Sequence, residues 1–243
     1  MIKKLTKKGF TIVELVIVVP IISVIAIGVI TLVMNMFFQI MANNSRLNLL
    51  LEAQTVLLSL QDELLFTTNY GEVIMSDLSD VHEPAGGWTF DTSPETLIVY
   101  ETTLTAPRRD PDREFVYKNN CSGSIAFDNV IYFAEPNPDN DYYTLYRRIL
   151  TPQYTTCNSN YRVQTCPTAF VGSDPCYSRD SVISDRLIDF EIDYYDQDNV
   201  LIDTDAGGTP LDAEKVTIHI SLGDSLFGRD VKAESSLTMR KIN

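Results

Sequence analysis

Four cysteines carry the most specific chemistry in this 243-residue chain, namely Cys121, Cys157, Cys166 and Cys176. An even number of cysteines indicates disulfides where the compartment is oxidising, although it leaves the pairing open. A Cys₄ zinc site is the alternative, but such sites usually contain a short CxxC-type spacing, which is absent here. The sequence therefore favours disulfides and keeps zinc as the alternative.

A second group of residues could bind calcium. Its carboxylates are Asp203, Asp205, Asp212 and Glu214. Asp203 and Asp205 stand at positions 1 and 3 of an EF-hand calcium loop, Gly208 at position 6 and Glu214 at position 12. However, Gly207 stands where an oxygen ligand is expected, and the flanking segments have strand patterns. A polar hairpin turn is the alternative, and calcium is the one structural cofactor that the sequence suggests.

Catalytic chemistry has little support. The chain has two histidines, His82 and His219, and neither has an obvious nucleophile nearby in the sequence. The segment from Ser122 to Ser124 does not match a nucleophile elbow, and Gly86-Gly87 lacks the rest of a phosphate-binding loop. We therefore expect no enzyme.

The formal net charge is −14, with 33 acidic and 19 basic residues. A nucleic-acid-binding protein would carry a basic stripe instead. The sequence thus argues against nucleic acid as a partner.

One carboxylate, Glu14, lies in a strongly apolar segment that runs from Ile12 to Phe38. About 20 apolar residues suffice to span a bilayer. The basic residues before the segment favour a cytoplasmic N-terminus, with the rest of the chain outside. A carboxylate in hydrocarbon costs about 2.5–3.5 kcal/mol on insertion scales, so Glu14 indicates a function. Pro20 is expected to kink or locally unwind the helix.

The string Lys7-Lys8-Gly9-Phe10-Thr11-Ile12-Val13-Glu14-Leu15 resembles the class III signal of type IV prepilins and type II secretion pseudopilins. The resemblance implies that a prepilin peptidase cuts after Gly9 and methylates Phe10, the new N-terminus. Glu14 would then neutralise the Phe10 amine of a neighbouring subunit and so guide filament assembly. The alternative is an uncleaved single-span membrane anchor.

The rest of the chain predicts one α+β domain on a long helix. Helical spacing continues over residues 39–66, with Leu47, Leu51, Leu57 and Leu60 among its apolar positions. Beyond it the period changes to two, which predicts antiparallel strands. We expect strands at 96–102, 125–134, 143–150, 188–194, 216–222 and 231–240. The predicted parts are a leader (1–9), a membrane or filament-core helix (10–38), its amphipathic continuation (39–66) and an extracytoplasmic β-rich domain (67–243).

The predicted hairpin between 125–134 and 143–150 suggests how the cysteines pair. If residues 133 and 143 face each other, the register brings Cys121 near Cys157. Cys166 would then pair with Cys176 within the loop 151–181, which contains three of the four cysteines.

The C-terminal third, with Tyr194-Tyr195-Asp196 and a final strand ending Leu237-Thr238-Met239-Arg240, resembles the PilW-like minor pilins and the J-type minor pseudopilins. This resemblance implies a type IV pilin-like fold and a subunit that initiates or caps a filament for pilus biogenesis, type II secretion or DNA uptake. Its implied partners are other pilins or pseudopilins, a prepilin peptidase, an assembly platform in the cytoplasmic membrane and a cytoplasmic ATPase. The alternative function is a membrane- or filament-anchored adhesin that binds ligand through the loop 151–181.

Overall fold

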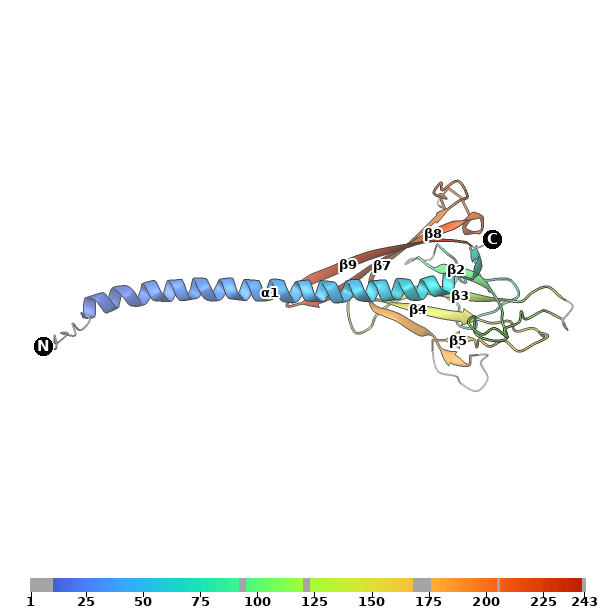
Figure 1. Ribbon diagram of the computed structural model, residues 1–243, viewed down its shortest axis with the longest axis horizontal. Helices are drawn as coiled ribbons and strands as arrows, with labels where there is room; N and C mark the ends of the chain where they lie inside the picture. Colours follow the sequence, from blue (N-terminus) through green and yellow to red (C-terminus); the bar gives the residue numbers. More distant parts are fainter. Residues whose placement is uncertain (1–10, 92–94, 120–122, 168–175, 205, 242–243) are drawn as a thin grey trace. The chain divides into compact units, whose positions relative to one another are not determined.

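The computed structural model describes residues 11–91, 95–119, 123–167, 176–204 and 206–241. The chain divides into two compact units, Met1–Ser45 and Arg46–Asn243. Helix α1 (Ile12–Leu64) begins in the first unit and ends in the second, which contains all the other elements (Figure 1).

The first unit consists, where it is described, of the apolar part of α1. Its large apolar side chains are almost all exposed, and the helix is long and apolar enough to cross a membrane. Pro20 lies inside α1, and helical structure continues on both sides of it. Helical structure is therefore kept at Pro20, and the expected kink stays a prediction. The proline removes one N–H from the helical ladder and its ring crowds the carbonyl four residues earlier, while the many neighbouring hydrogen bonds hold the helix.

The second unit is built on a seven-stranded antiparallel sheet with the order β1-β2-β3-β4-β7-β8-β9 (Figure 1). Its strands are β1 (Thr67–Gly71), β2 (Leu97–Thr102), β3 (Phe127–Pro136), β4 (Tyr143–Leu150), β7 (Ser181–Tyr195), β8 (Lys215–Leu226) and β9 (Arg229–Arg240). Two short parallel strands, β5 (Thr165–Cys166) and β6 (Ser178–Arg179), form a second sheet, and η1 (Pro210–Asp212) is a 3-10 turn. The α+β class is confirmed, as are all six predicted strand regions.

The main core lies between the last turns of α1 and one face of the sheet. Leu49, Ala53, Leu57, Leu60 and Leu64 of the helix are buried together with alternate residues of the strands. β8 shows the alternation most clearly, since Val216, Ile218, Ile220 and Leu222 are all buried. A smaller cluster around Trp88, Ile131 and Phe133 covers the other face of β2 and β3. These strands are thus buried on both faces.

Three sequence-based expectations were wrong in detail. Leu47 and Leu51 are exposed, and Leu49 and Ala53 take the buried positions of the helix. Phe133 pairs with Tyr146 rather than with residue 143, because β3 continues to Pro136 and shortens the hairpin loop. β1, a short strand of mostly polar residues, was not predicted.

Candidate functional site

Glu14 lies in the first turn of α1, where it forms a capping box with Thr11. Its Oε2 accepts hydrogen bonds from the Thr11 backbone N–H at 2.9 Å and from the Thr11 hydroxyl at 2.8 Å. The Glu14 N–H donates in return to Thr11 Oγ1 at 3.3 Å. This exchange satisfies two amide groups that a helix start leaves without partners. The carboxylate therefore has a local structural role, which the sequence analysis missed although the pattern Thr-x-x-Glu signals it. Gly9 and Phe10 lie outside the described residues.

The three cysteines that the structure describes are disulfide-bonded. Cys166 and Cys176 form a disulfide with their Cα atoms 5.7 Å apart, which is the pairing expected for these two residues. Cys157 is disulfide-bonded as well, while Cys121, its expected partner, lies outside the described residues. His82 lies close to the Cys166–Cys176 pair, with all ligand atoms within 4.8 Å of one another. A cysteine binds zinc as a thiolate, however, and a disulfide supplies none.

A buried arginine, Arg148, holds the disulfide segment against the sheet. Its guanidinium contacts Asp180 Oδ2 at 2.7 Å and Asp80 Oδ2 at 2.8 Å, and all three side chains are almost fully buried. Asp180 also accepts from the Thr165 hydroxyl at 2.8 Å, and Asp80 accepts from the Trp88 indole N–H at 2.7 Å. Because Thr165 precedes Cys166, these contacts connect the disulfide directly to β4.

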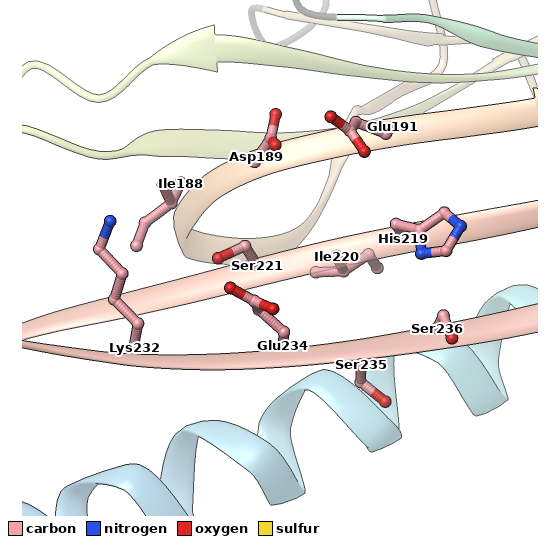
Figure 2. A pocket seen from close by; sticks show the side chains of 10 residues that line it. All are labelled: Ile188, Asp189, Glu191, His219, Ile220, Ser221, Lys232, Glu234, Ser235 and Ser236. Carbon is pink, nitrogen blue, oxygen red and sulfur yellow. The ribbon is translucent and has the colours of Figure 1, made fainter.

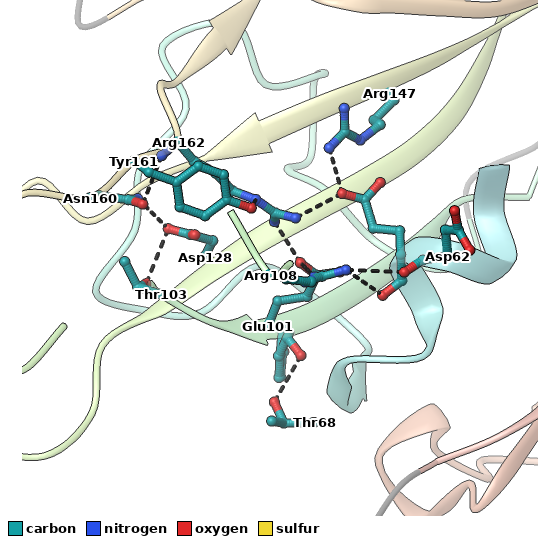
Figure 3. A network of polar contacts seen from close by, with 12 residues as sticks. Asp62, Thr68, Glu101, Thr103, Arg108, Asp128, Arg147, Asn160, Tyr161 and Arg162 are labelled. Atoms are coloured by element: carbon teal, nitrogen blue, oxygen red, sulfur yellow. Dashed lines mark hydrogen bonds and ion pairs between the residues drawn. The ribbon is translucent and has the colours of Figure 1, made fainter. Parts of the chain in front are cut away.

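A second network joins the end of α1 to the sheet. The Glu63 carboxylate pairs with Arg147 and, at 2.8 Å, with Arg162, and it accepts a hydrogen bond from the Tyr132 hydroxyl. Arg108 donates to the backbone carbonyls of Asp62 and Glu63, at 3.2 and 3.1 Å (Figure 3). The last carbonyls of a helix lack the usual partner four residues on, and the Glu63 carbonyl also accepts from the Phe66 N–H at 3.2 Å. Arg108 thus contributes to the C-terminal cap.

The same network continues into the sheet through Glu101 and Asp128. Glu101 pairs with Arg108 and, at 2.5 Å, with Arg162 (Figure 3). Burial raises the pKa of Glu101, and the nearby Arg162 only partly opposes this. Burial also raises the pKa of Asp128 to about 7. The network thus fixes the helix end on β2, β3 and β4, but its charges are largely committed to one another.

Pocket-like hollows lie on the outer face of β7, β8 and β9. One of about 500 Å³ is lined by Asp189, Glu191, His219, Lys232 and Glu234 among others (Figure 2). A second, of about 390 Å³, lies beside the loop 140–143, and the two hollows share Ile188 and Lys232. His219 Nε2 lies 3.2 Å from Asp193 Oδ2. No serine hydroxyl bonds to His219 in the described part of the chain, so the hollow lacks the contacts of a catalytic triad.

The described members of the predicted calcium loop are not gathered into a cation site. Glu214 pairs with Lys241 at 3.5 Å, and Asp203 Oδ1 accepts a hydrogen bond from the Ala206 N–H at 3.0 Å. Asp212 belongs to η1, and Asp205 lies outside the described residues. Calcium binding at this loop stays a prediction.

Comparisons of the chain with protein-family models, with curated proteins and with solved structures found no match.

Proposed function

We propose that this chain is a minor pilin or pseudopilin, a structural subunit that joins other such subunits to initiate or cap a filament at the cytoplasmic membrane. The observation that carries the proposal is the exposed and strongly apolar helical segment 12–38, whose one charged residue is Glu14. This segment directly follows the Lys7-Lys8-Gly9-Phe10 signal.

The exposed apolar surface of this helix is too large to remain in contact with water. A lipid bilayer covers the helix before assembly, and the apolar helices of neighbouring subunits cover it in a filament. The transfer leaves the Glu14 carboxylate in a medium of low dielectric constant, where an unpaired charge is costly. The cationic amine of a processed Phe10 on the neighbouring subunit removes that cost.

The second unit supports the same role. A helix that anchors the subunit in a filament requires that its far end is held firmly by the exported domain. Here Arg108 caps that end, and Glu63 pairs with two arginines of the sheet domain. The Cys166–Cys176 disulfide further restrains the domain, as suits the oxidising side of the membrane.

The capping box permits a sharp test of the role of Glu14. Glu14→Gln keeps the capping interaction, which glutamine also makes, but removes the charge. Thr11→Val removes the cap but keeps the charge. Both variants are expressed in the native cells, and the filament fraction is sheared or purified and probed for the subunit.

We expect Glu14→Gln to remain in the membrane and to be lost from filaments, while Thr11→Val still enters them. Loss of Thr11→Val together with normal incorporation of Glu14→Gln would mean that Glu14 acts only as a helix cap. Normal incorporation of Glu14→Gln would contradict the proposed function.

A further inference from the structure

β9 is the longer of the two strands that end the seven-stranded sheet, and no described residue outside β8 pairs with it. It ends the strand order and pairs with β8 over all 12 of its residues, without a register shift. Natural edge strands are commonly short, bulged or interrupted by proline, because a long free edge pairs with other strands. β9 contains no proline and no bulge against β8. Its outer edge is therefore competent to pair.

The β8–β9 turn determines which backbone groups face outward. Phe227 and Gly228 have φ angles of 53° and 72°, as in a two-residue type I′ hairpin. In such a hairpin the flanking residues, Leu226 and Arg229, form a hydrogen-bonded pair. Odd-numbered residues of β9 thus bond to β8, and even-numbered residues direct their N–H and C=O groups away from it. The bond from Lys241 N to Glu214 O, at 2.8 Å, continues this alternation.

The outward-bonding residues are also uncovered. All six of them are exposed, namely Asp230, Lys232, Glu234, Ser236, Thr238 and Arg240. On the other face of β9, Val231 and Leu237 are only partly buried against the core. A strand added at this edge would bury both side chains further.

We propose that β9 pairs antiparallel with β9 of a second copy of this chain, with Ser235 facing Ser235 on the two-fold axis. The six outward-bonding residues then exchange about twelve backbone hydrogen bonds with their counterparts. Asp230 of each copy faces Arg240 of the other, which forms two opposite-charge pairs. On the core face, Val231 meets Met239 and Ala233 meets Leu237, so apolar side chains meet apolar ones.

The charged residues of β9 favour this pairing register over the alternative registers. A shift by an odd number of residues exchanges the faces of the strand. The adjacent even registers place Glu234 opposite Glu234, or Lys232 opposite Arg240, and like charges directly opposite are destabilising. A register centred on Ala233 pairs Lys232 with Glu234, but it places Arg229 against Leu237. The register centred on Ser235 combines full strand length, two Asp230–Arg240 pairs and matched apolar residues. At its two ends it places Arg229 opposite Lys241, whose charge is balanced by Glu214 at 3.5 Å.

Cysteine cross-linking tests the register in the full chain, purified in detergent micelles. In the proposed dimer the two Ser235 Cα atoms face each other at about 4.5 Å. The Ser236 Cα atoms lie about 8 Å apart, beyond the reach of a disulfide. We expect Ser235→Cys to form a disulfide-linked dimer under mild oxidation. The wild-type chain and the matched variants Ser236→Cys and Ser225→Cys, the latter on β8, should remain monomeric on a non-reducing gel.

A charge exchange tests the same interface without cysteines. Asp230→Arg and Arg240→Asp should each raise the dimer dissociation constant roughly tenfold, because each places like charges opposite one another twice. The double variant restores both pairs and should regain the wild-type dissociation constant. Analytical ultracentrifugation measures the constants, and circular dichroism verifies that each variant is folded.

Equal cross-linking of Ser235→Cys and Ser236→Cys would mean unspecific collision within micelles and would overturn the proposal. Absence of a Ser235→Cys dimer would do the same, and so would a double variant no better than the single ones. None of these outcomes bears on Glu14, so the proposed filament function is tested independently of the β9 dimer.

Discussion

Asp128 gives the sharpest prediction about stability, because it is a carboxyl group that folding places where a charge is costly. It is 1% exposed, and its Oδ1 accepts from the Thr103 hydroxyl at 3.1 Å and from the Asn160 side-chain amide at 2.8 Å. Oδ2 is buried and has no hydrogen-bond partner among the described residues. Burial raises the pKa of Asp128 from 3.8 to about 7.

The sign and size of the effect follow from proton linkage. Between pH 4 and 7 the folded state holds a proton on Asp128 that the unfolded state has lost, so stability falls as the pH rises. Each pH unit in this window costs about 1.4 kcal/mol. The contribution is complete below the unfolded pKa and is lost once the pH has passed the folded pKa.

Asp128→Asn removes this titration. Relative to the wild type, its free energy of unfolding should therefore improve by about 3 kcal/mol between pH 5 and pH 7.5. The difference in unfolding free energy between the variant and the wild type is compared at the two pH values. Any cost of the new amide group that does not depend on pH cancels in this comparison. Urea unfolding of the full chain in detergent, followed by the fluorescence of the single, buried Trp88, measures it.

The exposed residue Asp139 supplies the matched control, since Asp139→Asn should give the same difference from the wild type at both pH values. A constant difference for Asp128→Asn, or one that changes in the opposite direction, would refute the reasoning.

Two further predictions concern the disulfide segment. Arg148→Met leaves two buried carboxylates, Asp80 and Asp180, without their cation and should cost about 3–5 kcal/mol of unfolding free energy, whereas the exposed Arg186→Met should cost less than about 0.5 kcal/mol. Equal effects of the two variants in urea unfolding would contradict this role for Arg148. Replacing Cys166 and Cys176 together by serine should cost about 3 kcal/mol, as the release of a loop of this length requires. An unchanged urea midpoint would show that Arg148 alone holds the segment.

The periodic elements could be predicted from the sequence because their patterns are local. The apolar run identified α1, and alternation identified β8 and β9 as strands with one buried face. The register between β3 and β4 was harder to predict. The pairing of Phe133 with Tyr146 follows only when the length of the hairpin loop is known. β1 was missed because its stability comes from pairing with β2 rather than from its own residues.

The polar networks could not be predicted in the same way. Glu63 meets Arg147 and Arg162 across 84 and 99 residues of chain, and nothing in the local sequence indicates such contacts. The capping box at Thr11 and Glu14 is the opposite case. Its pattern is visible in the sequence, but it was overlooked because the same glutamate belongs to the prepilin-like signal.

The intact mass of the protein purified from its native membrane, before and after reduction, tests the central proposal most directly. We expect a chain that runs from Phe10 to Asn243 and carries one added methyl group, with four hydrogens gained on reduction. A mass that corresponds to the full chain from Met1 would contradict prepilin processing, and the chain would then be an uncleaved membrane anchor.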